Sequence, residues 1–116
     1  MLSVSAICLV FTTFPDAETA HKLATHLVEA RLAACVNILA SCQSVYRWQG
    51  KLQTDGEIPL IIKTTMELYP NVEAFLRQHH PYTLPEIIAL DVARGLPEYL
   101  AWVADSTGPD QDMTGV

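Results

Sequence analysis

The sequence predicts an α+β domain, a ferredoxin-like βαββαβ sandwich followed by a short C-terminal helix. Apolar, β-branched runs of strand length recur four times along the chain, and two amphipathic stretches of helical period separate them. Glycine or proline marks most of the junctions. In a sandwich of this order, two helices cover one face of an antiparallel sheet.

The composition supports a single folded domain. The chain has 116 residues, of which 50% are apolar and 17% are charged, and this length can bury a core without disulfide staples. Thirteen acidic residues outnumber seven basic ones, so the formal net charge is −6. This balance disfavours a nucleic acid partner, because a phosphate backbone requires a basic surface.

The cysteines and the apolar runs predict a cytoplasmic protein with no membrane partner. Cys8, Cys35 and Cys42 are odd in number and form no C-x-x-C pair, which favours reduced thiols over a disulfide framework. The first residues do not resemble a signal peptide. The longest apolar runs are much shorter than the ~20 residues of a membrane helix.

The first half of the fold is predicted over residues 4–48. Residues 4–13 are almost continuously apolar, as in a central strand that is buried on both faces. Asp16 is a suitable N-cap for the following helix, whose apolar positions recur at helical spacing over about four turns. Residues 34–48 then return to strand composition, with a polar interruption at residues 41–44.

The second half begins with a hairpin turn at residues 49–51. Residues 58–65 form the next predicted strand, in which Pro59 cannot donate to a ladder and marks an edge or a bulge. A second helix is expected to begin near Pro70 and to end before Pro81.

The C-terminal part contains the fourth strand, residues 87–92, and a short helix that opens at Pro97. Residues 106–116 are polar and have no period, so we expect a domain over residues 1–105 and a flexible tail after it. Two helices cover one sheet face, and the other face is open unless the last helix reaches it. An open apolar face predicts oligomerisation.

The segment 79–86, with the sequence HHPYTLPE, is the densest polar and aromatic stretch. Its two prolines stiffen a loop that either holds a ligand or only connects a helix to a strand. His79 and His80 are candidate metal ligands. Consecutive helical side chains diverge, so both can bind one ion only if the helix has ended by His80.

Other candidate residues leave two interpretations open. Cys35 is either a small buried hydrophobe or a nucleophile that needs a neighbouring base. Lys63 interrupts an apolar strand and is either paired with a carboxylate or in contact with a ligand. The remaining candidates are Trp48, Glu57 and Glu86. The common catalytic motifs do not occur, so the sequence gives no direct support for an enzyme.

Several segments together resemble the divalent-cation tolerance protein family CutA. They are AACVNI in the second strand, YRWQGK in the hairpin, LIIKTT in the third strand and HHPYTLPEI before the fourth. The resemblance covers roughly residues 4–105 and implies the ferredoxin-like fold derived above. It also implies a homotrimer, a PII-like assembly in which strands two and three extend across subunit boundaries and cover the open sheet face.

The resemblance further implies a non-enzymatic, copper-binding metal-response protein. By motif, His79 and His80 would bind copper or another divalent cation weakly. Thr12 stands where some relatives have a cysteine, which favours a nitrogen-ligated Cu(II) or zinc site over a soft Cu(I) site. We expect folding to survive a chelator, because such a site is shallow and labile.

The alternative is a PII-like signalling module that binds a small effector or another unidentified partner in the intersubunit cleft. The resemblance places six residues around that cleft: Cys35, Trp48, Glu57, Lys63, Tyr82 and Glu86.

Overall fold

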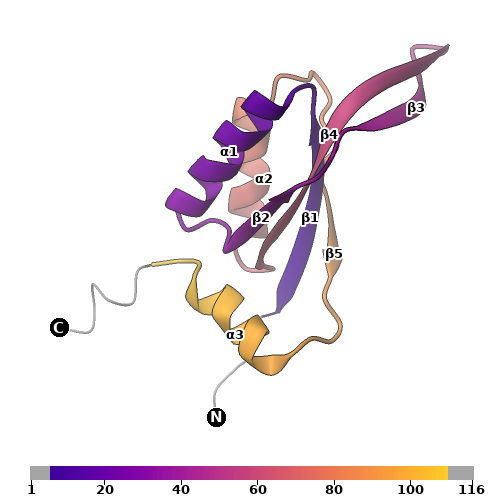
Figure 1. Cartoon of the computed structure of the whole chain (residues 1–116). Helices are drawn as coiled ribbons and strands as arrows, with labels where there is room; N and C mark the ends of the chain where they lie inside the picture. Colours follow the sequence, from indigo (N-terminus) through magenta and orange to yellow (C-terminus); the bar gives the residue numbers. More distant parts are fainter. Residues whose placement is uncertain (1–5, 110–116) are drawn as a thin grey trace.

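The computed structural model describes residues 6–109 and shows an antiparallel sheet with three helices (Figure 1). The strands are β1 (Ile7–Phe14), β2 (Cys35–Ile38), β3 (Cys42–Trp48), β4 (Lys51–Thr65) and β5 (Ile88–Asp91). The helices are α1 (Ala17–Glu29), α2 (Tyr69–His79) and α3 (Pro97–Asp105). The predicted mixed α+β class is confirmed. None of the helices in residues 6–109 combines the length and the apolarity needed to cross a bilayer.

The fifteen-residue strand β4 organises the sheet. Its C-terminal half lies between β1 and β2, and its N-terminal half pairs with β3 in a hairpin that projects beyond the rest of the domain (Figure 1). The strand order is β2-β4-β1-β5. The predicted turn is confirmed: Gln49 and Gly50 both have positive φ angles, of 51° and 80°, as a two-residue hairpin turn of type I′ requires.

The second predicted strand, residues 34–48, is two strands in the structure. The ladder breaks at residues 39–41, where the Leu39 amide donates to the carbonyl oxygen of Pro59 over 2.9 Å. Pro59 has no amide with which to return this bond, and the pairing is interrupted there. Of the two predicted alternatives for Pro59, the edge is wrong, because Pro59 lies on the inner strand β4, opposite Thr13 of β1. The bulge agrees with the register, since residues 39–41 lie opposite only residues 58–59 between the pairs Ile38–Leu60 and Cys42–Glu57.

The third predicted strand also has a different start. It was expected at residue 58, but β4 begins at Lys51 because hairpin pairing with β3 carries the polar residues 53–57 into the ladder. The predicted N-cap of α1 is confirmed, since the Asp16 carboxylate accepts a hydrogen bond from the Thr19 amide at 2.7 Å.

The core lies between one sheet face and the helices α1 and α2. Alternate residues of β1 and β4 point into it and meet the apolar stripes that the helical spacing predicted. The fully buried side chains of this cluster are Cys8, Val10, Phe14, Ala20, Leu27, Ala33, Leu60, Ile62, Val72 and Leu76.

The other sheet face is only partly covered. At one end of it, α3 packs Val103 against Ile7 and Ala34. We call the rest of this sheet face the open face. It consists of the apolar side chains that alternate with the core residues along β1, β4 and β5. Its members are Leu9, Phe11, Ile61, Ile88 and Leu90, and the last two are 53% and 56% exposed.

The chain beyond α3 stays attached to the domain through Arg31. Its guanidinium donates from Nε to the Gly108 carbonyl at 2.6 Å and from Nη2 to the Asp105 carbonyl at 2.8 Å. Thr107 is buried, and the Gly108 amide donates back to the Arg31 carbonyl at 2.9 Å. Folded contacts therefore extend past residue 105, where we expected the domain to end. Residues 110–116 of the expected tail lie outside the described part of the chain.

Candidate functional site

The two adjacent histidines have different environments. Helix α2 ends at His79, and His80 is extended, with φ −74° and ψ 137°, as the following Pro81 favours. His79 is exposed, with its ring centroid 4.5 Å from that of Phe75. His80 turns into the domain and stacks on Phe14, with ring centroids 4.3 Å apart and planes inclined by 17°. The helix has thus ended by His80, but the two imidazoles point to different surroundings.

Both ring nitrogens of His80 have protein partners. Nε2 lies 2.8 Å from the Thr13 carbonyl oxygen, which can only accept, so this nitrogen carries the proton. Nδ1 accepts from the Tyr82 amide over 3.1 Å. Burial lowers the pKa of His80 below its usual value, against opposing contributions from the Thr13 carbonyl and Glu57. His80 is therefore a neutral imidazole whose nitrogens are both engaged.

Glu57 joins two strands and a loop. The Thr13 hydroxyl, at the end of β1, donates to Glu57 Oε2 over 3.0 Å, and the Tyr82 hydroxyl donates to the same oxygen over 2.9 Å. Burial first, and then the hydrogen bond to Glu57, raise the pKa of Tyr82 well above its usual value. The phenol is therefore a stable donor. Two residues before Glu57 on β4, the Asp55 carboxylate accepts a hydrogen bond from the Tyr46 hydroxyl of β3.

The structure brings together some of the predicted cleft residues. Glu57 and Tyr82 are in direct contact. Cys35 lies opposite Lys63 in the β2–β4 ladder. The Lys63 ammonium lies 3.3 Å from the Tyr99 hydroxyl and 5.5 Å from the centroid of its ring, so its observed partner is α3.

The other two predicted cleft residues lie apart from these pairs within one chain. Trp48 is at the tip of the hairpin, opposite Lys51, and is 42% exposed. Glu86 is exposed on the loop before β5. Any cleft that unites Trp48 with Lys63 would therefore need more than one chain.

Sequence reasoning missed Thr13, Phe14, Tyr46 and Asp55 as parts of this region. The pair of hydroxyl residues at positions 12–13, near the end of an otherwise apolar strand, was a local signal for Thr13 alone. The stacking of Phe14 on His80 and the hydrogen bond from Thr13 to Glu57 depend on contacts between segments far apart in the sequence.

A profile of the CutA1 divalent ion tolerance protein family matches residues 8–106. The chain belongs to this family. It is 47% identical over 100 residues to the divalent-cation tolerance protein CutA of Thermus thermophilus, with 86% of this chain and 97% of that protein covered. It is 43% identical over 99 residues to the chloroplastic Protein CutA of Arabidopsis thaliana, with 85% of this chain covered.

Among solved structures, that of CutA1 from Oryza sativa matches with a TM-score of 0.88 and 40% identity, covering 91% of this chain and 98% of that one. The chain spans 54% of the Arabidopsis protein's length. The resemblance seen in the hairpin and in the HHPYTLPEI segment is thus confirmed at the level of the family.

This CutA1 family member does not hold a complete metal site within residues 6–109. No three His, Cys, Asp or Glu side chains of that range lie close enough together to bind one ion. The thiols of Cys8, Cys35 and Cys42 are free, but Cys8 is buried and burial raises its pKa. Of the two predicted ligands, His79 is exposed, whereas His80 would have to give up a hydrogen bond to bind a metal.

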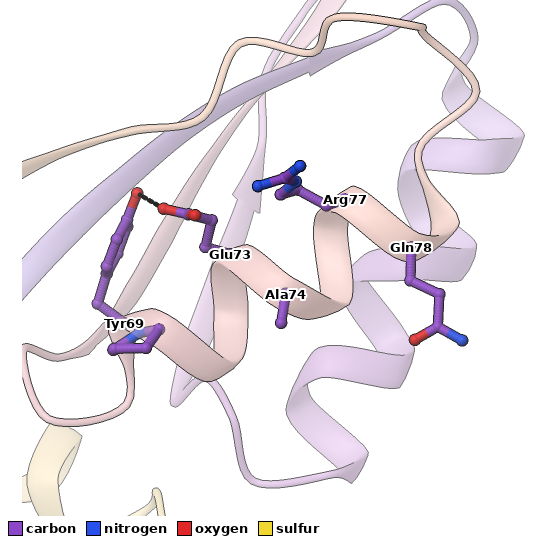
Figure 2. Close-up of a pocket in the computed structure, with 6 residues that line it drawn as sticks. Tyr69, Glu73, Ala74, Arg77 and Gln78 are labelled. Carbon is purple, nitrogen blue, oxygen red and sulfur yellow. Dashed lines mark hydrogen bonds between the residues drawn. The ribbon is translucent and has the colours of Figure 1, made fainter.

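A surface hollow of about 540 Å³ lies along the outer side of α2 (Figure 2). Tyr69 and Glu73 line it, and the Tyr69 hydroxyl donates to the Glu73 carboxylate over 2.8 Å. Arg77 and Gln78 line its other end. None of the predicted site residues lies in this hollow, so it does not belong to the candidate site.

Proposed function

We propose that this CutA1 family member acts in tolerance of divalent cations as a homotrimeric metal-response protein and not as an enzyme. The names of the relatives in this family support the functional class. The open face supports the assembly, because Ile88 and Leu90 are more than half exposed in the single chain. Removing such apolar area from water favours association, against the entropy that the subunits lose on assembly.

Each subunit of the proposed trimer has the ferredoxin-like fold, if β2 and β3 are counted as one interrupted strand. The three subunits are arranged as in PII-like proteins. Light scattering should give about three times the chain mass of 12.8 kDa, and the value should hold on dilution. The mass of a single chain under native conditions would contradict this assembly.

For the metal, we propose weak binding of Cu(II) or another divalent cation that begins at His79. An imidazole nitrogen suits Cu(II), and the net charge of −6 favours the approach of a cation. His80 would join as a second ligand only after losing its bond to the Thr13 carbonyl or to the Tyr82 amide. Because the metal would compete with these hydrogen bonds for the His80 nitrogens, we expect the bound ion to exchange readily.

Calorimetric titration of Cu(II) tests this assignment. We expect His79→Ala to weaken binding by about tenfold or more, a loss of roughly 1.4 kcal/mol. His26→Ala is the matched control, because His26 is also exposed in the last turn of a helix, and it should bind Cu(II) as the wild type does. Equal affinity in the wild type and His79→Ala would remove His79 from the site.

A cytoplasmic location stays a prediction, which the three free thiols support because reduced cysteines are typical of that compartment. The alternative function is a module that binds a small effector. Within residues 6–109 of one chain, the contacts do not favour it, because Trp48 lies at the hairpin tip and Lys63 lies opposite Cys35 in the β2–β4 ladder.

A further inference from the structure

One face of the projecting hairpin carries opposite charges at its two ends. The β3–β4 register and strand alternation place Lys51 at the tip, and Asp55 and Glu57 at the base, on the same side of β4. We call this side the hairpin face. Its members are Cys42, Ser44, Tyr46, Trp48, Lys51, Gln53, Asp55 and Glu57. By the same alternation it continues into Ile61 of the open face.

The two carboxylates at the base find hydroxyls as their partners in the chain. Glu57 accepts from Thr13 and Tyr82, and Asp55 accepts from Tyr46. These bonds satisfy oxygen atoms but leave two negative charges side by side.

The lysines on this side of β4 are separated from those two carboxylates along the strand. Lys51 and Lys63 each stand six residues from Glu57, which is about 20 Å along a strand, and Lys51 stands four residues from Asp55, which is about 13 Å. Lys63 is also held by Tyr99 of α3. Lys51 faces Trp48 across the ladder at the tip, where both side chains are exposed.

We propose that Lys51 at the hairpin tip of one subunit docks against Asp55 and Glu57 at the hairpin base of a second copy of this chain. The inference rests on the proposed homotrimer and names the residues that join its subunits. A tip-to-base contact uses different surfaces of the two copies, and contacts of this kind form a ring when the rotation between neighbouring copies closes, as the proposed homotrimer requires.

The aromatic side chains of the hairpin face suit such a contact. Trp48 and Tyr46 are 42% and 40% exposed, and aromatic residues are enriched in the centres of subunit interfaces. Because the hairpin face continues into the open face, a second copy seated on the base would also be positioned to cover Ile61 and its neighbours.

Charge variants test the contact by the concentration at which the assembly dissociates, followed by light scattering on dilution. We expect Lys51→Glu to weaken subunit association by about tenfold or more at low salt. Glu57→Gln should also weaken it while keeping an oxygen that accepts from Thr13 and Tyr82. The loss should shrink at 1 M salt, where the screening length is about 3 Å.

The matched control is Lys22→Glu, the same charge reversal at an exposed position of α1, which should assemble as the wild type does. If the Lys51→Glu assembly dissociates at the same protein concentration as the wild-type assembly, the tip-to-base contact is wrong even though the trimer is correct. If the wild type itself has the mass of one chain, the proposed homotrimer fails, so the two failures are distinguishable.

Cross-linking gives a second, independent test through the native Cys42, which is exposed and pairs with Glu57 at the hairpin base. In Lys51→Cys, mild oxidation should produce covalently linked chains on a non-reducing gel. The two thiols of one chain cannot join, because position 51 is about 20 Å from the base and a disulfide needs Cα atoms within about 7 Å. The variant Lys51→Cys/Cys42→Ser should give no linked chains. Linked chains in that control, or none in Lys51→Cys, would contradict the contact.

Discussion

Replacing His80 by alanine is expected to lower the free energy of unfolding by about 3 kcal/mol. The change removes the hydrogen bonds to the Thr13 carbonyl and from the Tyr82 amide, each worth roughly 1 kcal/mol, and the stacking on Phe14, worth about as much. Urea denaturation at pH 7.5 measures the difference.

The neighbouring residue provides the control for this substitution. His79 is exposed, and its ring lies beside that of Phe75 one turn earlier in α2, so His79→Ala should change stability by no more than about 0.5 kcal/mol. Equal losses in the two variants would show that the interior contacts of His80 contribute nothing.

The same side chain should make stability depend on pH. Burial lowers the pKa of His80 in the folded chain, while the unfolded chain titrates near 6.5. In the interval between these values the unfolded state binds more protons, so the free energy of unfolding falls as pH drops below about 6.5. The fall ends only when the folded state is protonated as well. His80→Ala should lack this component, and identical slopes in variant and wild type would contradict it.

Replacing Leu90 by aspartate is expected to convert the three-chain assembly into single chains and to lower the melting temperature strongly. In a single chain Leu90 is 56% exposed, and a polar substitution there would cost little. If a second copy covers the open face, the same substitution buries a carboxylate without a partner, at a cost of several kcal/mol.

Met66→Asp is the control for Leu90→Asp. Met66 is 39% exposed in the turn between β4 and α2 and is not one of the open-face residues, so its replacement should leave the mass of the assembly unchanged. Light scattering and thermal denaturation of both variants make the comparison. A Leu90→Asp variant that keeps the wild-type mass would show that the subunits meet elsewhere.

The order of the elements was readable from the sequence because its determinants are local. Pro70 and Pro81 bound α2, and Asp16 caps α1, as the helical patterns predicted. The break between β2 and β3 was not readable, because its cause is Pro59, which lies on another strand. Composition around residues 41–44 suggested an interruption there, but the pairing places it at residues 39–41.

The candidate site could be predicted only in part for the same reason. The sequence shows that Pro81 ends the helix and that adjacent histidines diverge. It does not show that His80 stacks on Phe14, because this contact depends on how β1 lies against α2 and the following loop. Glu57 and Tyr82 were identified through a family motif, and their contact follows from the alignment of β4 with the end of β1.

The two halves of β4 differ in how far along the chain their partners lie, and this difference orders the events of folding. The hairpin half is joined to β3 by a two-residue turn, and such hairpins form in about 1–10 μs. The other half pairs with residues 7–14, a non-local contact that closes slowly. During synthesis, the apolar strand β1 stays without its partner until β4 has been made. In that interval β1 is an unpaired apolar strand, and unpaired strand edges of this kind favour aggregation.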